Sequence, residues 1–166
     1  MTPDEPAGRP PRTVVLGLGN ILLGDEGVGV RVVEELERTG GLPGVELVDG
    51  GTAGFSLLSY FDGARLVVVV DAAADGAPPG TVTLTRPEFS GTYPAALTPH
   101  EVGLKNILDA LALTGVRPEI ALVTVSVAEA DRASLELSPP VAAAVREAAD
   151  RIRRLLTRPA GSSTSR

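Results

Sequence analysis

Short apolar runs alternate along most of this chain with longer stretches of helical periodicity. The run 66–70 is apolar at every position, which predicts a strand covered on both faces, as central parallel strands are. The stretch 81–85 alternates threonine with apolar residues, which predicts a half-exposed edge strand, and we expect it to be antiparallel. The other expected strands are 13–18, 45–48 and 120–127.

Two helical patterns lie in the first half of the chain. In 27–38, valine and leucine recur every four residues, and Asp25 is placed to cap the helix entry. A shorter helix is expected after Gly54, through 57–58.

Two further helices are expected, each with a sharp start. Thr98 as N-cap, Pro99 as first residue and Glu101 three residues after the cap form a capping box. Ser138 and Pro139 begin the last helix in the same way. The apolar stripe of this last helix consists of Val141, Val145, Ala148, Ile152 and Leu155.

Strands that alternate with helices predict an α/β fold, with a mostly parallel sheet covered by helices. The 166 residues suffice for one domain with its own core, which we expect to cover 13–157. The segments 1–12 and 158–166 are expected to be flexible tails, and no internal repeat is present.

Composition removes several function classes. Hydrophobic residues make up 43% of the chain and aromatic residues 3%, so aliphatic side chains must form the core. The formal net charge of −6 argues against a nucleic-acid or anionic-lipid partner, which requires clustered lysine and arginine. The absence of cysteine excludes disulfides, thiolate metal sites and a cysteine nucleophile. No apolar run could span a bilayer, and we expect a cytoplasmic protein.

Polar residues that follow the expected strands are the candidates for a functional site. In open α/β sheets, ligands bind outside the carboxyl ends of the strands. Four of the expected strands are followed by such polar residues. They are Asn20 and Glu26 after the first strand, Asp49 after the second, Asp71 after the third and Glu129 after the last.

The single histidine, His100, joins this set through helical spacing. It lies four residues before Leu104 and eight before Leu108, on the apolar stripe of its helix. If that helix runs antiparallel to the strands, its N-terminus lies at their carboxyl ends. One imidazole with two carboxylates can bind a borderline divalent metal ion, and a helix N-terminus disfavours the imidazolium form.

Each candidate also has a structural explanation when it is taken alone. His100 at a helix start is more often structural, and Asp71 could serve a turn or a cap. Asp25 is better explained as a helix cap than as a ligand, while Glu26 could simply favour the helix dipole. The convergence of these residues at one edge of the sheet favours a functional site.

A dinucleotide-binding turn is the nearest alternative. Gly17 and Gly19 match the first two positions of the fingerprint, but Leu22 occupies the third glycine position. Asp49 could then serve as the ribose-binding acid. A second histidine four residues after His100, which a zincin helix needs, is missing.

Three motifs occur in order along the chain. They are Gly-Leu-Gly-Asn-Ile-Leu-Leu-Gly-Asp-Glu-Gly-Val-Gly-Val at 17–30, Asp-Gly-Gly-Thr-Ala-Gly at 49–54, and Thr-Pro-His at 98–100, with Asp71 between the last two. Together they resemble the hydrogenase maturation proteases over about 13–156. The resemblance implies a three-layer α/β/α fold with a twisted, mostly parallel five-stranded sheet of the phosphorylase/hydrolase-like kind.

The resemblance also implies an activity. It indicates an endopeptidase that removes a short C-terminal extension from the large-subunit precursor of a nickel-iron hydrogenase, after nickel has been inserted. By position, the metal-contacting residues correspond to Glu26, Asp71 and His100. Some family members have aspartate where this chain has Glu26, which changes the reach and retains the charge.

The second motif corresponds to the family's recognition box. Its acid is Asp49, and its neighbours help to recognise the nickel-loaded precursor. We expect the recognition residues to be Asn20, Gly50, Gly51 and Thr52.

The sequence leaves two mechanisms open. In the first, Glu26, Asp71 and His100 complete the coordination of the precursor's nickel, which polarises the scissile carbonyl or acidifies a water. In the second, nickel is a recognition mark, and Asp49 or Glu26 acts as general base on the attacking water. Both predict that the isolated enzyme holds the metal weakly, because three ligands leave an open face that awaits a fourth ligand from the substrate. A dinucleotide-binding module and a nickel carrier that does not cleave remain as alternatives.

Overall fold

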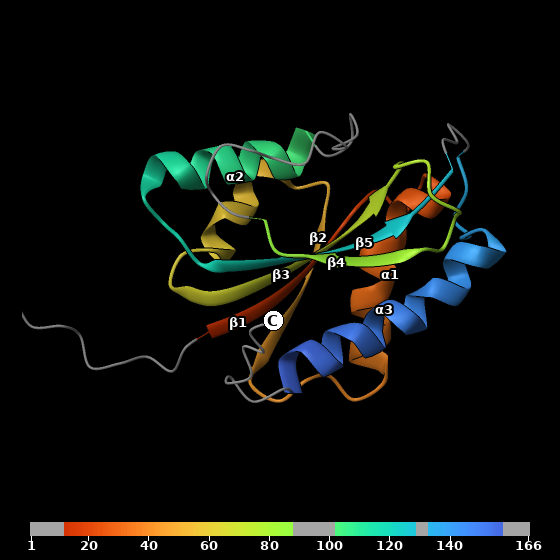
Figure 1. Ribbon diagram of the computed structural model, residues 1–166, viewed down its shortest axis with the longest axis horizontal. Coiled ribbons are helices and arrows are strands. Elements are labelled where there is room, and N and C mark those ends of the chain that lie inside the picture. Colours follow the sequence, from red (N-terminus) through yellow and green to blue (C-terminus); the bar gives the residue numbers. More distant parts are fainter. Residues whose placement is uncertain (1–11, 88–101, 129–132, 158–166) are drawn as a thin grey trace, which may run out of the picture.

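The computed structural model describes residues 12–87, 102–128 and 133–157, and shows one sheet between two helical layers (Figure 1). The sheet has five strands in the order β2-β1-β3-β5-β4. All neighbouring strands pair in parallel except β4, which is antiparallel to β5 at the edge. The strands are β1 (Arg12–Leu18), β2 (Val45–Gly51), β3 (Ala64–Ala73), β4 (Val82–Thr85) and β5 (Glu119–Ser126).

The helices form one layer on each face of the sheet. On one face, α1 (Val28–Arg38) packs beside α3 (Pro139–Thr157), drawn orange and blue in Figure 1. On the other face, the 3₁₀ helix η2 (Gly54–Tyr60) packs against α2 (Val102–Thr114). A short 3₁₀ helix, η1 (Gly24–Gly27), leads from β1 into α1. The expected three-layer α/β/α fold is therefore confirmed.

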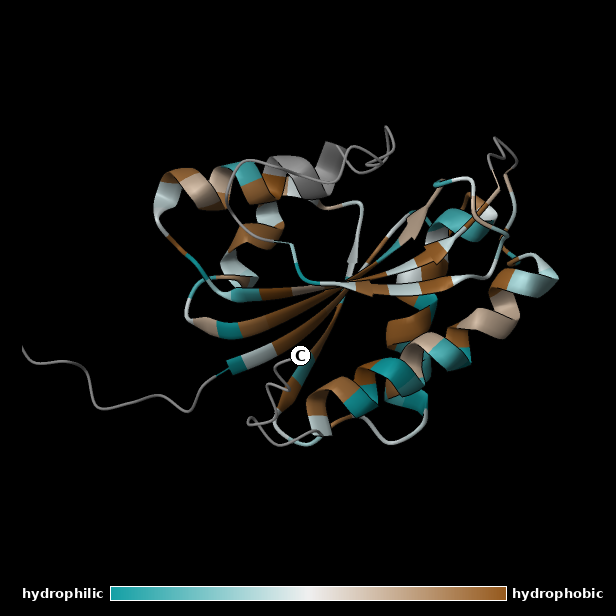
Figure 2. Cartoon of the chain, in the orientation of Figure 1, coloured by the Kyte–Doolittle hydropathy of each residue, from teal (hydrophilic) through white to brown (hydrophobic). Residues whose placement is uncertain are grey.

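The central strand β3 is buried on both faces, as its continuous apolar run predicts. Val68 and Val70 belong to the core beneath α1 and α3, whereas Val67 and Val69 belong to the core beneath η2 and α2. All four valines are fully inaccessible to solvent. Figure 2 shows the same arrangement, with mostly hydrophobic strands between helices in which hydrophobic and hydrophilic positions alternate.

Two expected strands extend further than their apolar runs. β2 continues to Gly51 and β3 continues to Ala73, so Asp49 and Asp71 lie within the strands and not after them. The reason is pairing: Asp71 is in register with Thr124 of β5, and the ladder continues beyond it. Both carboxylates are thus fixed to a strand backbone.

The expected cap of the first helix is wrong. Gly27 is the N-cap of α1, and no side chain caps it. Asp25 lies two residues before this N-cap, inside the 3₁₀ helix η1. The carboxylate of Asp25 instead accepts hydrogen bonds from Ser138, the residue that precedes α3.

The start of the third expected helix, at Thr98, lies outside the described residues, as do 1–11 and 158–166 of the two expected tails. Arg12, a residue of the first expected tail, is instead the first residue of β1. The described part of this helix is α2, from Val102. The last helix begins at Pro139, as expected. Within the three described stretches, no helix is both long and apolar enough to cross a membrane.

Candidate active site

The chain reverses its direction of travel across the sheet at β1. From β1 it passes through α1 to β2 on one side, and from β2 through η2 to β3 on the other side. α1 and η2 pack on opposite faces of the sheet. Such divergent connections open a crevice at the carboxyl ends of the two strands involved. The topological switch point of this sheet therefore lies between β1 and β3.

Glycines let the first connection turn tightly over the ends of β1 and β3. A Cβ on Gly29 would lie 2.3 Å from the carbonyl oxygens of both Leu18 and Val70, so α1 begins almost in contact with the two strands. Gly19 has a φ of 125°, and a Cβ there would overlap the carbonyl oxygen of Glu26. The glycine-rich stretch thus brings the Glu26 backbone to the switch point.

Glu26 and Asp71 lie on segments that touch each other. Glu26 is half-buried in η1, and η1 contacts β3. The point of close approach between α1 and β3 is Val70, the residue directly before Asp71. Of the expected carboxylates that the structure describes, these two come from segments that meet at the switch point.

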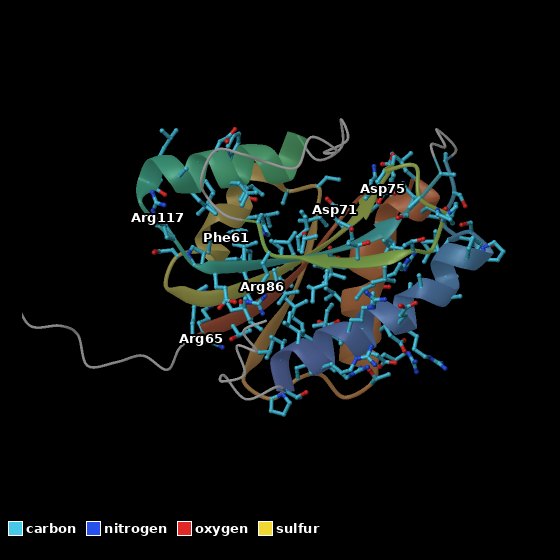
Figure 3. All side chains as sticks on the ribbon, viewed as in Figure 1. Phe61, Arg65, Asp71, Asp75, Arg86 and Arg117 are labelled. Atoms are coloured by element: carbon cyan, nitrogen blue, oxygen red, sulfur yellow. The ribbon has the colours of Figure 1, made fainter. Side chains whose placement is uncertain are left out.

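Asp71 lies on the α2 side of the sheet. It continues the alternating series of Val67 and Val69, which pack beneath η2 and α2. Figure 3 shows it near the carboxyl end of β3, on the side where α2 lies. Asp71 is half-buried, and its Oδ1 accepts the N–H of Ala72 at 2.8 Å. A short, rigid tether of this kind limits the positions that the carboxylate can adopt.

Asp49 is placed differently from Asp71. It is exposed and continues the series of Val45 and Leu47, which pack against the α1 and α3 layer. In addition, β1 lies between the strands that bear Asp49 and Asp71. The structure therefore separates Asp49 from Asp71, although both are near the same edge of the sheet.

The recognition box is joined to the glycine turn by its backbone. Gly51 accepts the N–H of Gly19 at 3.0 Å, which ties the end of β2 to the end of β1. A Cβ on Gly50 would lie 2.8 Å from Cδ1 of Leu16, so this glycine also allows close packing. Thr52 is exposed. Its role in recognition stays a prediction, as do those of the two glycines.

Asn20 shapes the turn that follows β1. Its Oδ1 accepts the N–H of Leu22 at 2.9 Å, and its carbonyl oxygen accepts the N–H of Leu23 at 3.0 Å. This pattern is a side-chain-stabilised turn, for which asparagine is well suited. The structure thus gives Asn20 a local structural role, and its contact with a substrate stays a prediction.

His100 and Glu129 lie outside the described residues, but the direction of α2 bears on His100. Only residues 115–118 connect α2 to β5, so α2 ends at the amino edge of the sheet and begins at the carboxyl edge. Figure 1 shows the first described turn of α2 at that end. His100 precedes this turn by two residues. Among the described residues, no three carboxylates or histidines form a cluster able to hold a metal ion.

The segment between β5 and α3 also supports the site, and sequence reasoning missed it. Gly24 donates to the carbonyl oxygen of Ser134 at 2.7 Å, and Ser134 donates to that of Leu22 at 3.0 Å. Together with the Asp25 to Ser138 bonds, these contacts join segments more than one hundred residues apart. Periodicity and capping rules describe local contacts only, so they carry no signal for this pairing.

Fold and site together define a three-layer α/β/α domain with an acidic site at its switch point. A family model, HycI, described as hydrogenase maturation protease, matches residues 30–155, more than half of the chain. The chain belongs to the hydrogenase maturation protease family, and is an endopeptidase by that membership.

Individual relatives agree with this assignment. The Hydrogenase 2 maturation protease of Escherichia coli K12 is 37% identical over 144 residues, which cover 85% of this chain and 88% of the relative. The hydrogenase expression/formation protein HupD of Rhodobacter capsulatus is 41% identical over 68% of this chain, which spans only 55% of that relative. Among solved structures, the hydrogenase maturating endopeptidase HybD from E. coli matches with a TM-score of 0.74 and 36% identity. The match covers 87% of this chain and 91% of HybD.

Proposed function

We propose that this endopeptidase cleaves a short C-terminal extension from the nickel-loaded large-subunit precursor of a nickel-iron hydrogenase. The observation that supports it is the contact between the Glu26 turn and the Asp71 strand, at the switch point of the family's fold. Glu26 and Asp71 come from neighbouring strand ends, and His100 precedes the helix that begins at the same edge.

The donor set fits a nickel ion that arrives with the precursor. Two carboxylates and one imidazole suit a borderline divalent ion, and three protein ligands leave a coordination position open. In this proposal Glu26, Asp71 and His100 supply the three donors, and the precursor supplies the ion with its remaining ligands. The isolated enzyme is then expected to hold nickel weakly.

The structure bears on the choice of general base in the second mechanism. Asp49 is exposed and lies on the opposite face of the sheet from Asp71, and β1 separates the strands that bear them. A general base must lie within hydrogen-bond reach of the water it activates. If nickel is only a recognition mark, Glu26 is therefore the general base that activates the attacking water. Asp49, with the neighbouring glycines, Thr52 and Asn20, then serves in recognition of the precursor.

The decisive experiment mixes the purified protein with precursor, with and without nickel, and measures the precursor's mass. We expect loss of the extension only from the nickel-loaded precursor. His100→Ala and Asp71→Asn should abolish cleavage while circular dichroism shows an unchanged fold. Unchanged cleavage by both variants would refute the proposed site.

The same assay separates the alternatives. A nickel carrier would leave the loaded precursor uncut at every enzyme concentration. A dinucleotide-binding module would bind NAD tightly in calorimetry, with no effect of nickel on the protein. The comparisons do not favour either alternative. The cytoplasm stays the compartment predicted from the sequence.

A further inference from the structure

Asp25, next to Glu26 in η1, accepts hydrogen bonds from Ser138 at the start of α3. Its Oδ1 accepts the backbone N–H of Ser138 at 2.6 Å, and its Oδ2 accepts the Ser138 hydroxyl at 2.7 Å. Both oxygens are therefore engaged by one residue, at a partly buried position. A charged acceptor forms stronger hydrogen bonds than a neutral one, so this contact is a firm tether.

Ser138 is a rigid point of attachment. It is the residue before α3, and its carbonyl oxygen accepts the N–H of Ala142 at 2.8 Å, as an N-cap residue does. The helix that follows packs against α1 and the sheet through side chains that are fully buried, including Val141 and Ile152. The negative charge of Asp25 also lies at the positive end of this helix dipole. By binding Ser138, Asp25 therefore attaches η1 to a helix that is fixed in the core of the domain.

The backbone on either side of Asp25 is held to the same segment. Gly24 donates to Ser134 at 2.7 Å, and Leu22 accepts from Ser134 at 3.0 Å. Gly19, the residue after β1, approaches the same turn so closely that a Cβ there would overlap the carbonyl oxygen of Glu26. The Glu26 backbone thus lies between the end of β1 and a clamp formed by Asp25, Ser134 and Ser138.

We infer that Asp25 is a positioning residue: by binding Ser138, it fixes η1 so that the Glu26 carboxylate is held at the switch point beside Asp71. This inference rests on the proposed function, because it concerns the activity of that same site. Asp25 itself contacts neither the precursor nor the reacting atoms in this account. Its effect is transmitted through the backbone of the next residue.

Asp75 offers a matched control. Its Oδ2 accepts the hydroxyl of Ser126 at 3.1 Å, and its Oδ1 accepts the N–H of Ala77 at 3.1 Å. Asp75→Ala thus removes the same kinds of hydrogen bond as Asp25→Ala, also near the carboxyl edge of the sheet (Figure 3). The difference is that none of these bonds holds η1.

The experiment compares Asp25→Ala with Asp75→Ala in steady-state cleavage of the nickel-loaded precursor and in amide hydrogen exchange. For Asp25→Ala we expect kcat to fall by roughly 10–100-fold with KM within about twofold, since a misplacement near 1 Å has costs of this size. We also expect faster exchange of the amides at 24–27, because the turn opens locally. Asp75→Ala should change neither kcat nor exchange at 24–27 by more than about twofold.

Asp25→Asn keeps an acceptor for the Ser138 N–H and should give an intermediate kcat, which keeps the inference testable if Asp25→Ala does not fold. The inference is overturned if Asp25→Ala and Asp75→Ala behave alike, or if Asp25→Ala raises KM alone. A wild-type protein that fails to cleave the precursor would overturn the proposed function and the catalytic part of this inference. The exchange measurement would still decide whether Asp25 fixes the turn.

Discussion

Gly29 is the position where one added methyl group tests both the packing and the site. It is the second residue of α1 and lies directly over the ends of β1 and β3. A Cβ there would be 2.3 Å from the carbonyl oxygens of Leu18 and Val70 and 2.8 Å from the Leu18 nitrogen. All three atoms belong to the backbone of paired strands, so no side-chain rotation can relieve the overlap.

The magnitude of the effect of Gly29→Ala follows from these distances. Ordinary contact begins at 3.4 Å, so the start of α1 must move by about 1 Å from the sheet. Overpacking of this kind lowers the free energy of unfolding by about 1–3 kcal/mol, and the better helix propensity of alanine offsets about 0.5–1 kcal/mol of that loss. The net loss is at most about 2.5 kcal/mol, and we expect Tm to fall by up to roughly 10 °C. Since Glu26 precedes α1 by only two residues, it moves relative to Asp71, and kcat should fall by about 100-fold.

The assay measures Tm and the rate of precursor cleavage at a temperature where both variants are folded. Ala148→Val is the control, because Ala148 is fully buried in α3, where the added methyl groups overpack the core on the same face of the sheet without changing α1 or η1. The control should lose a similar amount of stability and keep its cleavage rate within about threefold. Wild-type stability and activity in Gly29→Ala would refute the close approach of α1 to the strands. Equal loss of activity in both variants would refute the link to Glu26.

Two further predictions concern stability alone. Leu36→Ala removes a fully buried side chain of α1 and should lower the free energy of unfolding by about 2–5 kcal/mol in urea denaturation; a loss below about 1 kcal/mol would contradict the described core. Glu46→Gln breaks the ion pair with Arg12, whose Nη2 and the Glu46 Oε2 are 2.7 Å apart. The two side chains are 28% and 42% exposed, so the loss should be at most about 1 kcal/mol and should shrink in high salt; a salt-independent loss would contradict this assignment.

Much of the fold could be predicted because burial leaves a periodic trace in the sequence. The run 66–70 is apolar throughout, and the corresponding part of β3 is buried on both faces. The alternation in 81–85 likewise predicts the antiparallel edge strand β4. Strand ends were less accurate, because the ladder between β3 and β5 continues past the last valine to Ala73.

The site could be predicted in its chemistry and only partly in its geometry. The sequence places Glu26 and Asp71 near the carboxyl ends of two strands, and the fold makes those strands neighbours. It also places Asp49 at such an end. In the sheet, however, Asp49 lies on the opposite face from Asp71, and β1 lies between β2 and β3, the strands that bear them. Which strands pair, and in which order, is decided by packing of the whole core and not by local pattern.

The sequence by itself determined the element types, the apolar core, the supply of carboxylates with a single histidine, and the motifs of the family. Only the tertiary structure decided that Gly29 lets α1 begin against Val70, and that Asp25 binds Ser138 in place of capping its own helix. The physical reason is the distance along the chain over which each interaction acts. Periodicity and capping act within a few residues, whereas the Asp25 tether joins residues 113 positions apart, which become neighbours only when the sheet and its two helical layers have assembled.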